Sequence, residues 1–318
     1  MFIISLFLAT LFLAYANGAN DNFKGVATLF GSRTTSYQTA ILWGSFTTFA
    51  GAVSAVFWAG TFIEKFTSQN IFPNEMVNAP EIHLAVAITT GLTALIAALT
   101  GFPISTTHSI TGSLLGVGLV AIGLKVNFAA LEKSFILPLL FNPIIAICLS
   151  AGTYKLLRHI NLIFNWKPDQ KVINISHLIS TGIISFIRGF KDTPKIVSLI
   201  IIIDYFSIQG GMLTVAMAMG LGGLLNSQKI AQTMSEKITS MNHSQGLSAN
   251  LVTAFLVIVS NYIEIPISLT QVSVSSIFGV GLLEKQAKNR VFYKILFSWI
   301  LTLPITTIIS GIVYRLLQ

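Results

Sequence analysis

The sequence predicts an all-α polytopic membrane protein, built from two inverted repeats that contain broken or re-entrant helices. Of its 318 residues, 53% are apolar and 9% are charged, against about 25% charged residues in soluble domains. The mean hydropathy is +0.77, and apolar stretches long enough to cross a bilayer recur along the chain. The sequence lacks the short segments of alternating apolar and polar residues that a transmembrane β-barrel needs.

Apolar runs between charged residues mark the membrane-spanning segments. The first run resembles the apolar part of a signal peptide, and Ala14-Tyr15-Ala16 could serve as its cleavage site. No positive residue precedes that run, so we expect the first helix to be retained. We expect spans at residues 2–16, 38–60, 83–101, 132–157, 177–190, 194–222, 247–263 and 291–316.

Two further apolar segments, 104–124 and 267–283, are rich in Ser, Thr and Gly, and they begin at the isolated prolines Pro103 and Pro266. Irregular backbone at membrane depth is tolerated only beside a polar cavity. We therefore expect re-entrant half-helices here rather than full spans.

Two polar stretches separate these segments. Residues 155–176 carry several Lys and Arg residues against one acid, Asp169, so the positive-inside rule places this stretch in the cytoplasm. Residues 226–246 carry apolar residues at helical spacing, which predicts an amphipathic connecting helix at the interface or packed on the bundle. These apolar residues are Ile230, Met234, Ile238 and Met241.

The strongest organisational signal is an internal repeat. The stretch GANDNFK, which ends at Lys24, aligns with GFKDTPK, which ends at Lys195, so that Asp21 matches Asp192. The stretch PISTTHSITGSLLGVG aligns with PISLTQVSVSSIFGVG, and the motifs come in the same order in both halves. The chain is therefore interpreted as a duplicated unit.

The duplication predicts a first transmembrane repeat at 1–154, a polar basic linker at 155–176 and a second repeat at 177–318. The loop at 61–82 has three Glu against one Lys, whereas its counterpart at 226–246 has two Lys against one Glu. Opposite signs fit opposite membrane faces, which favours an inverted repeat. Transporters of this design bind their substrate near the midplane, where broken helices of the two repeats meet.

Charged residues at membrane depth are the first candidates for function. An acid at the centre of a membrane helix costs about 2.5–3.5 kcal/mol on insertion scales. Asp21 and Lys24 are three residues apart, so on a helix they share a face and partly neutralise each other. The alternative is an ion pair that only joins two helices. Because Asp192 and Lys195 repeat the pattern, we interpret both pairs as halves of one ion site.

The second copy also brings Arg188 and Lys191. If all the ionisable groups of both motifs face one cavity, their charges sum to two positives in excess, which suits a divalent anion. Arg188 could instead reach toward the membrane surface.

The Pro-Ile-Ser segments supply polar groups of another kind. Proline in a first helical turn followed by Ser and Thr is a helix-start signal, and unpaired N–H groups at such a start bind anions. Hydroxyls of Ser105, Thr106 and Thr107 would add donors, and Ser268 and Thr270 hold the matching places. The alternative is that these hydroxyls bond back to their own helices; the paired clusters favour anion binding.

Other chemistry finds less support in the sequence. Ser105 with His108 suggests a membrane hydrolase, but no third acid is near and Gln271 matches His108 in the second repeat. We favour a cavity-lining, proton-responsive His108. The single cysteine, Cys148, excludes an internal disulfide and a cysteine metal cluster. No ATP-binding loop is present, and the net charge of +8 lies largely in short loops, so neither an enzyme nor a nucleic-acid partner is expected.

With these residues in view, the chain resembles the inorganic phosphate transporter (PiT) family, whose members couple phosphate uptake to sodium or protons. GANDNFKG is similar to that family's Gly-Ala-Asn-Asp motif and PISTTH to its Ser-Thr-Thr-His motif, with GFKDTPK and PISLTQ as second-repeat counterparts. The resemblance implies an inverted-repeat helical fold and anion contacts from the Ser-Thr segments. It also implies cation contacts, with sodium as the one expected metal, from Asn20, Asp21 and Asp192.

The chain departs from that pattern at four positions. Lys24 and Lys191 stand where asparagine is usual, and Leu269 and Gln271 replace Thr and His. A fixed ammonium beside each acid could take the place of a bound cation. We therefore expect weak sodium dependence, with proton coupling through an acid or His108.

Together these observations predict a secondary transporter of inorganic phosphate in the cytoplasmic membrane, which works by alternating access and is coupled to protons or sodium. A sulfate permease of the same fold and an anion channel remain alternatives. The expected partners are phosphate or sulfate and the lipid bilayer, and the sequence leaves a homo-oligomer open. Candidate substrate-binding residues are Ser105, Thr106, Thr107, Ser268, Thr270, Lys24 and Lys195, and candidate ion-coupling residues are Asn20, Asp21, Asp192 and His108.

Overall fold

The computed structural model describes residues 2–58, 79–132, 136–163, 169–201, 207–262 and 267–318, and these form helices with no strand among them. The longer helices are α1 (Phe2–Asp21), α3 (Tyr37–Ala55), α5 (Pro80–Thr100), α6 (Thr106–Ile122), α8 (Leu137–Ile163), α9 (Gln170–Val197), α10 (Ile208–Asn226), α12 (His243–Tyr262), α13 (Leu269–Leu283) and α14 (Asn289–Leu317). Short helical pieces are η1 (Asn22–Gly25), α2 (Ala27–Gly31), η2 (Val56–Trp58), η4 (Gly123–Lys125), α7 (Phe128–Leu131), α11 (Gln228–Gln232) and the π-helical η6 (Thr233–Lys237).

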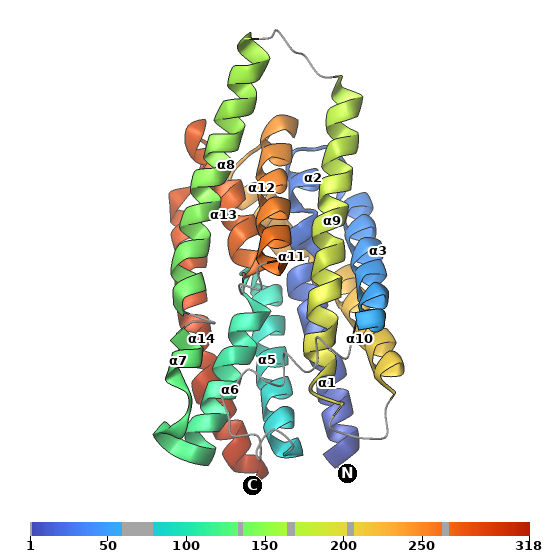
Figure 1. The fold of residues 1–318 in the computed structure, drawn as a ribbon, viewed down its shortest axis with the longest axis vertical. Helices are drawn as coiled ribbons and strands as arrows, with labels where there is room; N and C mark the ends of the chain where they lie inside the picture. Colours follow the sequence, from blue (N-terminus) through green and yellow to red (C-terminus); the bar gives the residue numbers. More distant parts are fainter. Residues whose placement is uncertain (1, 59–78, 133–135, 164–168, 202–206, 263–266) are drawn as a thin grey trace.

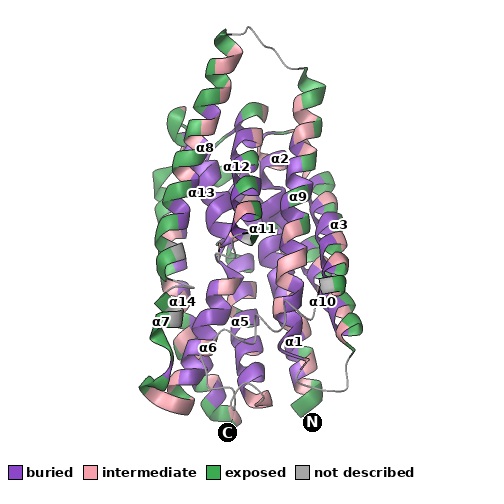
Figure 2. Cartoon of the chain, viewed as in Figure 1, coloured by how far each residue is buried: buried purple, intermediate pink, exposed green. Residues whose placement is uncertain are grey.

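The helices form one elongated bundle whose two termini lie at the same end (Figure 1). Seven helices among the described residues are long and apolar enough to cross a membrane. Buried residues concentrate along the middle of the bundle, while the outer helix faces are exposed (Figure 2). Those outer faces carry large apolar side chains, such as Phe46, Ile96, Leu140 and Ile308, as expected of surfaces that face lipid rather than water. The predicted all-α polytopic membrane fold is confirmed.

The two segments predicted to be re-entrant half-helices form α6 and α13, and each packs beside the helix that precedes it. Helix α6, continued by η4, is nevertheless one of the seven described helices long and apolar enough to cross a membrane, whereas α13 has 15 residues and is shorter. Helices α5 and α6 lie in one half of the bundle, and α12 and α13 lie in the other (Figure 1). The starts of α6 and α13 meet, because the Thr270 hydroxyl donates to the carbonyl of Ile104 at 3.1 Å. Helix α5 ends at Gly101, whose φ of 81° reverses the chain in a conformation that glycine adopts without strain. Pro266 lies outside the described residues.

Two expected elements differ from the structure. The spans expected at 177–190 and 194–222 are wrong at their boundary: α9 runs unbroken from Gln170 to Val197. The hydropathy pattern predicts that the charged residues near 191–195 mark the end of a span. In the structure, Lys191, Asp192 and Lys195 instead line a cavity inside the bundle.

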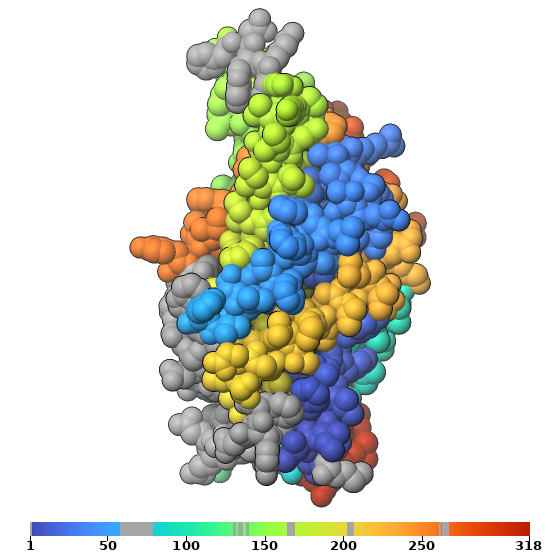
Figure 3. Space-filling view, turned by 90° about the vertical axis from the view of Figure 1, so that its right-hand side faces the viewer, coloured from blue at the N-terminus to red at the C-terminus, as the bar shows by residue number. Residues whose placement is uncertain are grey.

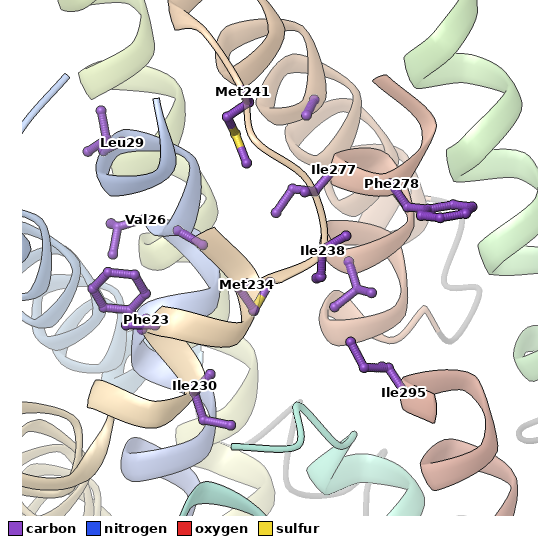
Figure 4. Packing of buried hydrophobic residues seen from close by; sticks show 14 of the residues in the cluster. Phe23, Val26, Leu29, Ile230, Met234, Ile238, Met241, Ile277, Phe278 and Ile295 are labelled. Carbon is purple, nitrogen blue, oxygen red and sulfur yellow. The ribbon is translucent and has the colours of Figure 1, made fainter. Parts of the chain in front are cut away.

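The amphipathic helix expected over 226–246 is also not one helix. The segment runs through α11 and η6 and then loses regular structure before α12. Its apolar residues are nevertheless buried, packed on the bundle rather than at the interface, as Figure 4 shows for Ile230, Met234, Ile238 and Met241. They meet Phe23 of the first motif, Val26 and Leu29 just after it, and Ile277, Phe278 and Ile295 from α13 and α14.

Close helix contacts at glycine hold the bundle around this core. On one face α3 and α10 lie side by side (Figure 3), and α10 also packs against α1. A Cβ on Gly222 of α10 would lie 1.9 Å from the carbonyl oxygen of Tyr15, and one on Gly18 would lie 1.9 Å from that of Met219. The small-residue face at Gly112 and Gly116 likewise contacts α14. Small residues let membrane helices approach this closely.

We expect Gly222→Ala to destabilise the folded protein by about 1–3 kcal/mol, because the added methyl must push α1 and α10 apart. Gly220→Ala, in the same helix but with nothing within 4 Å of its Cβ, is the matched control, and it should be neutral or stabilising by up to about 1 kcal/mol. Thermal unfolding of the purified protein in detergent measures both. Equal melting temperatures for the two variants would contradict the close contact.

Candidate functional site

A polar cavity lies where the end of α1, the starts of α6 and α13 and the C-terminal part of α9 come together. Its empty volume is about 490 Å³ including its open mouth. All of the sequence-predicted site residues line it except Asn20 and His108. The lining residues are Asp21, Lys24, Ser105, Thr106, Thr107, Ile187, Arg188, Lys191, Asp192, Lys195, Val257, Ile267, Ser268, Leu269 and Thr270.

Lys24 reaches this cavity because α1 stops at Asp21 and the chain continues as the short 3-10 segment η1. The Lys24 side chain is fully buried. Its Nζ donates to Asp21 Oδ1, to Asn20 Oδ1 at 2.5 Å, to the Ile104 carbonyl at 2.5 Å and to Thr270 Oγ1 at 2.8 Å. Asn20 therefore acts on the ammonium rather than on the cavity. One cation joins the first motif to two helix pairs, α5 with α6 and α12 with α13, which we call the two hairpins.

Both oxygens of the Asp21 carboxylate accept hydrogen bonds. Lys24 occupies Oδ1, while Oδ2 accepts the Thr106 hydroxyl at 2.7 Å and the Asn17 amide at 3.1 Å. Burial makes unpaired charge costly, and these contacts compensate the carboxylate within the protein.

The second acid–lysine pair is more open than the first. Asp192 Oδ1 accepts from Lys195 Nζ at 3.2 Å, and Asp192 Oδ2 lies 3.6 Å from Arg188 Nε. The side chains of Asp192 and Lys195 are 19% and 20% exposed, so this pair faces the cavity space directly. Lys195 Nζ also donates to Thr107 Oγ1 at 3.3 Å.

Arg188 does not extend to the membrane surface. It is 3% exposed, and its guanidinium donates to Asn22 Oδ1 and, at 2.5 Å, to Asn17 Oδ1. The sequence identified Arg188 as a candidate residue, but it did not identify Asn17 and Asn22, whose side-chain oxygens accept hydrogen bonds from the guanidinium and fix its position. Asn22 belongs to the GANDNFKG motif, so the motif itself was the available signal; Asn17 precedes that motif and carried none.

The two hairpins present helix starts to the cavity. Ser105 Oγ accepts the backbone N–H of His108 at 3.3 Å, and Ser268 Oγ accepts that of Gln271 at 3.4 Å. Each serine is thus the N-cap of its helix. Helix N-termini carry partial positive charge and attract anions, so two such ends aimed at one cavity reinforce its lysines and arginine.

The charges around the cavity do not cancel. Lys24, Arg188, Lys191 and Lys195 give four positive charges against two negative ones from Asp21 and Asp192, a net of plus two. A dianion would neutralise this excess. His108 lies behind the lining, buried in α6 at 3% exposure, and Gln271 accepts from Asn142 Nδ2 at 3.4 Å. Within the described part of the chain, no group of three or more His, Cys, Asp or Glu residues could hold a metal ion.

The chain is similar to known proteins over nearly its whole length. The family model described as "Phosphate transporter family" matches residues 17–310. A probable low-affinity inorganic phosphate transporter of Bacillus subtilis is 28% identical, with 99% of this chain and 97% of that protein covered. The sulfate permease CysP of the same organism is 27% identical, over 92% of this chain and 80% of that protein. A solved structure titled "The sodium-dependent phosphate transporter" has a TM-score of 0.84 and 22% identity, covers 99% of this chain and 98% of its own, and shows the shared fold.

Proposed function

Because this chain belongs to the phosphate transporter family, a family of transporters and not of enzymes, we propose that it carries inorganic phosphate across the cytoplasmic membrane. The proposed route is alternating access around the cavity between the two hairpins. The observation that carries the proposal is the cavity itself, which combines a net charge of plus two with two helix N-termini. Such a site favours a compact dianion over a neutral or cationic solute.

Asp192 supports phosphate among the tetrahedral dianions. Hydrogen phosphate keeps a proton that it can donate, whereas sulfate has none. Asp192 lines the cavity with 19% of its side chain exposed. Its carboxylate has room for further hydrogen bonds beyond the one from Lys195, since Arg188 contributes an ion pair at 3.6 Å and no hydrogen bond. Its oxygen is the acceptor we propose for the phosphate hydroxyl.

The two cap serines are the proposed neutral donors. Each serine oxygen accepts a backbone N–H as a cap, which leaves the hydroxyl proton available for an anion in the cavity. Thr106 and Thr270 differ, because Thr106 donates to Asp21 and Thr270 donates to the Ile104 carbonyl. We therefore assign those two threonines to holding the charged groups in place.

The proposed mechanism uses the two hairpins as inverted counterparts. They lie in opposite halves of the bundle and meet at the site (Figure 1), which is the arrangement that lets a fixed site open to either side in turn. Moving a dianion into a cell works against the membrane potential at about 2.3 kcal/mol per charge per 100 mV. A co-transported cation is therefore needed, and we propose the proton.

We propose an orientation with both termini outside the cell. The C-terminal end of α8 and the N-terminal end of α9, which carry Lys155, Arg158 and Lys171 of the basic stretch, lie opposite the two termini (Figure 1). The positive-inside rule places such a stretch in the cytoplasm.

Sulfate is the second candidate substrate. The sulfate permease among the relatives supports it, and the net charge of the cavity suits both dianions. Purified protein in proteoliposomes decides the question by counterflow: unlabelled phosphate inside should drive accumulation of labelled phosphate, while unlabelled sulfate should not. Accumulation driven by sulfate alone would reverse the substrate assignment. Large currents without counterflow would indicate an anion channel.

We expect Asp192→Asn to weaken phosphate binding by about 1–3 kcal/mol while leaving sulfate binding equal or tighter. The change replaces a charged acceptor, which only the phosphate hydroxyl uses, with a weaker neutral amide, and it raises the net charge. Binding titrations with both anions on the purified variant measure the shift. Equal weakening for phosphate and sulfate would show that Asp192 acts only by positioning Lys195 and Arg188.

A further inference from the structure

We propose that the Lys24 ammonium is the resident cation of an oxygen cage, so that a sodium ion neither binds at that place nor is needed there. The inference deepens the proposed function, since it concerns coupling, but its test reads binding to the cage and not transport.

The cage is made of four oxygen atoms around one nitrogen. They belong to the Asp21 carboxylate, the Asn20 side-chain amide, the Ile104 backbone carbonyl and the Thr270 hydroxyl. An ammonium has three protons to donate, yet all four oxygens lie at hydrogen-bonding distance from Nζ. Carboxylate, amide and backbone carbonyl oxygens are also the ligands by which proteins hold hard cations.

The four oxygens of the cage could coordinate a sodium ion, but the Lys24 ammonium already occupies the space between them. A solved structure of similar fold is titled "The sodium-dependent phosphate transporter". The oxygens around Lys24 are of the kinds that coordinate a sodium ion. Because Nζ contacts every member of the set and the side chain is fully buried, sodium does not fit there while Lys24 is present.

The second lysine offers a natural contrast. Lys195 Nζ has contacts with Asp192 Oδ1 and Thr107 Oγ1, and its side chain is 20% exposed at the cavity. Because the Lys195 side chain is open to the cavity whereas that of Lys24 is fully buried, we assign the resident-cation role to Lys24.

A tethered cation has a consequence that a free ion does not. The cage atoms come from α1, from the segment just before α6 and from α13, so the ammonium joins α1 to the starts of α6 and α13. It compensates Asp21 in every transport cycle but never crosses the membrane. This position therefore adds nothing to the ion stoichiometry.

The test is sodium-dependent thermal stability of substrate-free protein in detergent, with choline as the replacement cation. Lys24→Ala opens the cage and leaves its four oxygens, so we expect sodium to raise the melting temperature in a saturable manner, by roughly 5 °C at high occupancy. Lys24→Met removes the charge but fills the space, so it should not respond. Wild-type protein and Lys195→Ala should not respond either.

Every outcome decides the matter. A saturable sodium response in wild type equal to that of Lys24→Ala would overturn the proposal, because the cation would then bind elsewhere. No response in folded Lys24→Ala would also overturn it. If that variant aggregates, extraction in sodium and in choline is compared: recovery in sodium alone supports the cage, and aggregation in both contradicts it. A failure of phosphate counterflow would leave these results unchanged and would count against the transport proposal only.

Discussion

Asp21→Asn and Lys24→Met should each abolish phosphate uptake and markedly destabilise the folded protein, while the double variant should regain stability without regaining uptake. The pair is buried, with side-chain exposures of 9% for Asp21 and 0% for Lys24. Removing one member of such a pair leaves the other charge uncompensated, which costs about 3–5 kcal/mol. Replacing both restores the charge balance but removes the groups that join α1 to the two hairpins.

The measurement is labelled phosphate uptake into proteoliposomes beside the melting temperature of each purified variant. Asp192→Asn combined with Lys195→Met is the matched comparison, because this pair is about one-fifth exposed and solvent weakens its contribution to stability. We expect that second double variant to lose uptake with little change in melting temperature. Near-normal uptake in the Asp21→Asn, Lys24→Met protein would reduce the first pair to a structural ion pair.

The location of the site could be predicted from the sequence because its charges are costly where they stand. Asp21 and Lys24 follow directly after an apolar run of the sequence, where charges are rare. A second copy of the pattern at Asp192 and Lys195 argues against chance. The helix start at Ser105 could be predicted because serine is a favoured N-cap, and its side chain accepts the backbone N–H of His108. Such local preferences depend only on residues that are close in the sequence, so they can be predicted for each segment separately.

The partners of these residues could not be predicted, since they come from distant parts of the chain. Thr270 contacts Lys24 across 246 residues, and Arg188 contacts Asn17 across 171. A hydropathy reading also treats a charged cluster as the end of a span. It therefore divided α9 near Asp192, where the charges instead face an interior cavity.

The hydroxyl roles changed for the same reason. From the sequence, the serines and threonines after the two prolines are all candidates to bind the anion, with Thr107 and Thr270 ahead of Ser105 and Ser268. The structure distinguishes them by where their protons go: Thr106 donates to Asp21 and Thr270 to Ile104, whereas Ser105 and Ser268 accept at their oxygens. Only three-dimensional neighbours supply that information.

The last prediction follows from this distinction. Ser105→Ala and Ser268→Ala should each weaken phosphate binding about 10- to 100-fold, because each removes a hydrogen bond to a charged ligand worth about 1.5–3 kcal/mol. Each change also removes a helix cap, worth about 1 kcal/mol of stability. Ser36→Ala isolates that second effect, since Ser36 caps α3 through the N–H of Thr39 at 3.2 Å and does not line the cavity.

Equilibrium binding of labelled phosphate and thermal unfolding, measured on the same preparations, separate the two contributions. Ser36→Ala should lose stability like the cavity serines yet bind phosphate normally. Thr270→Val should differ from all three: it removes an oxygen that accepts from Lys24 and a proton given to Ile104, so stability and binding should fall together. If Ser105→Ala and Ser268→Ala bind phosphate as Ser36→Ala does, the serines serve only as caps. The anion would then be held by the lysines, Arg188 and the backbone N–H groups alone.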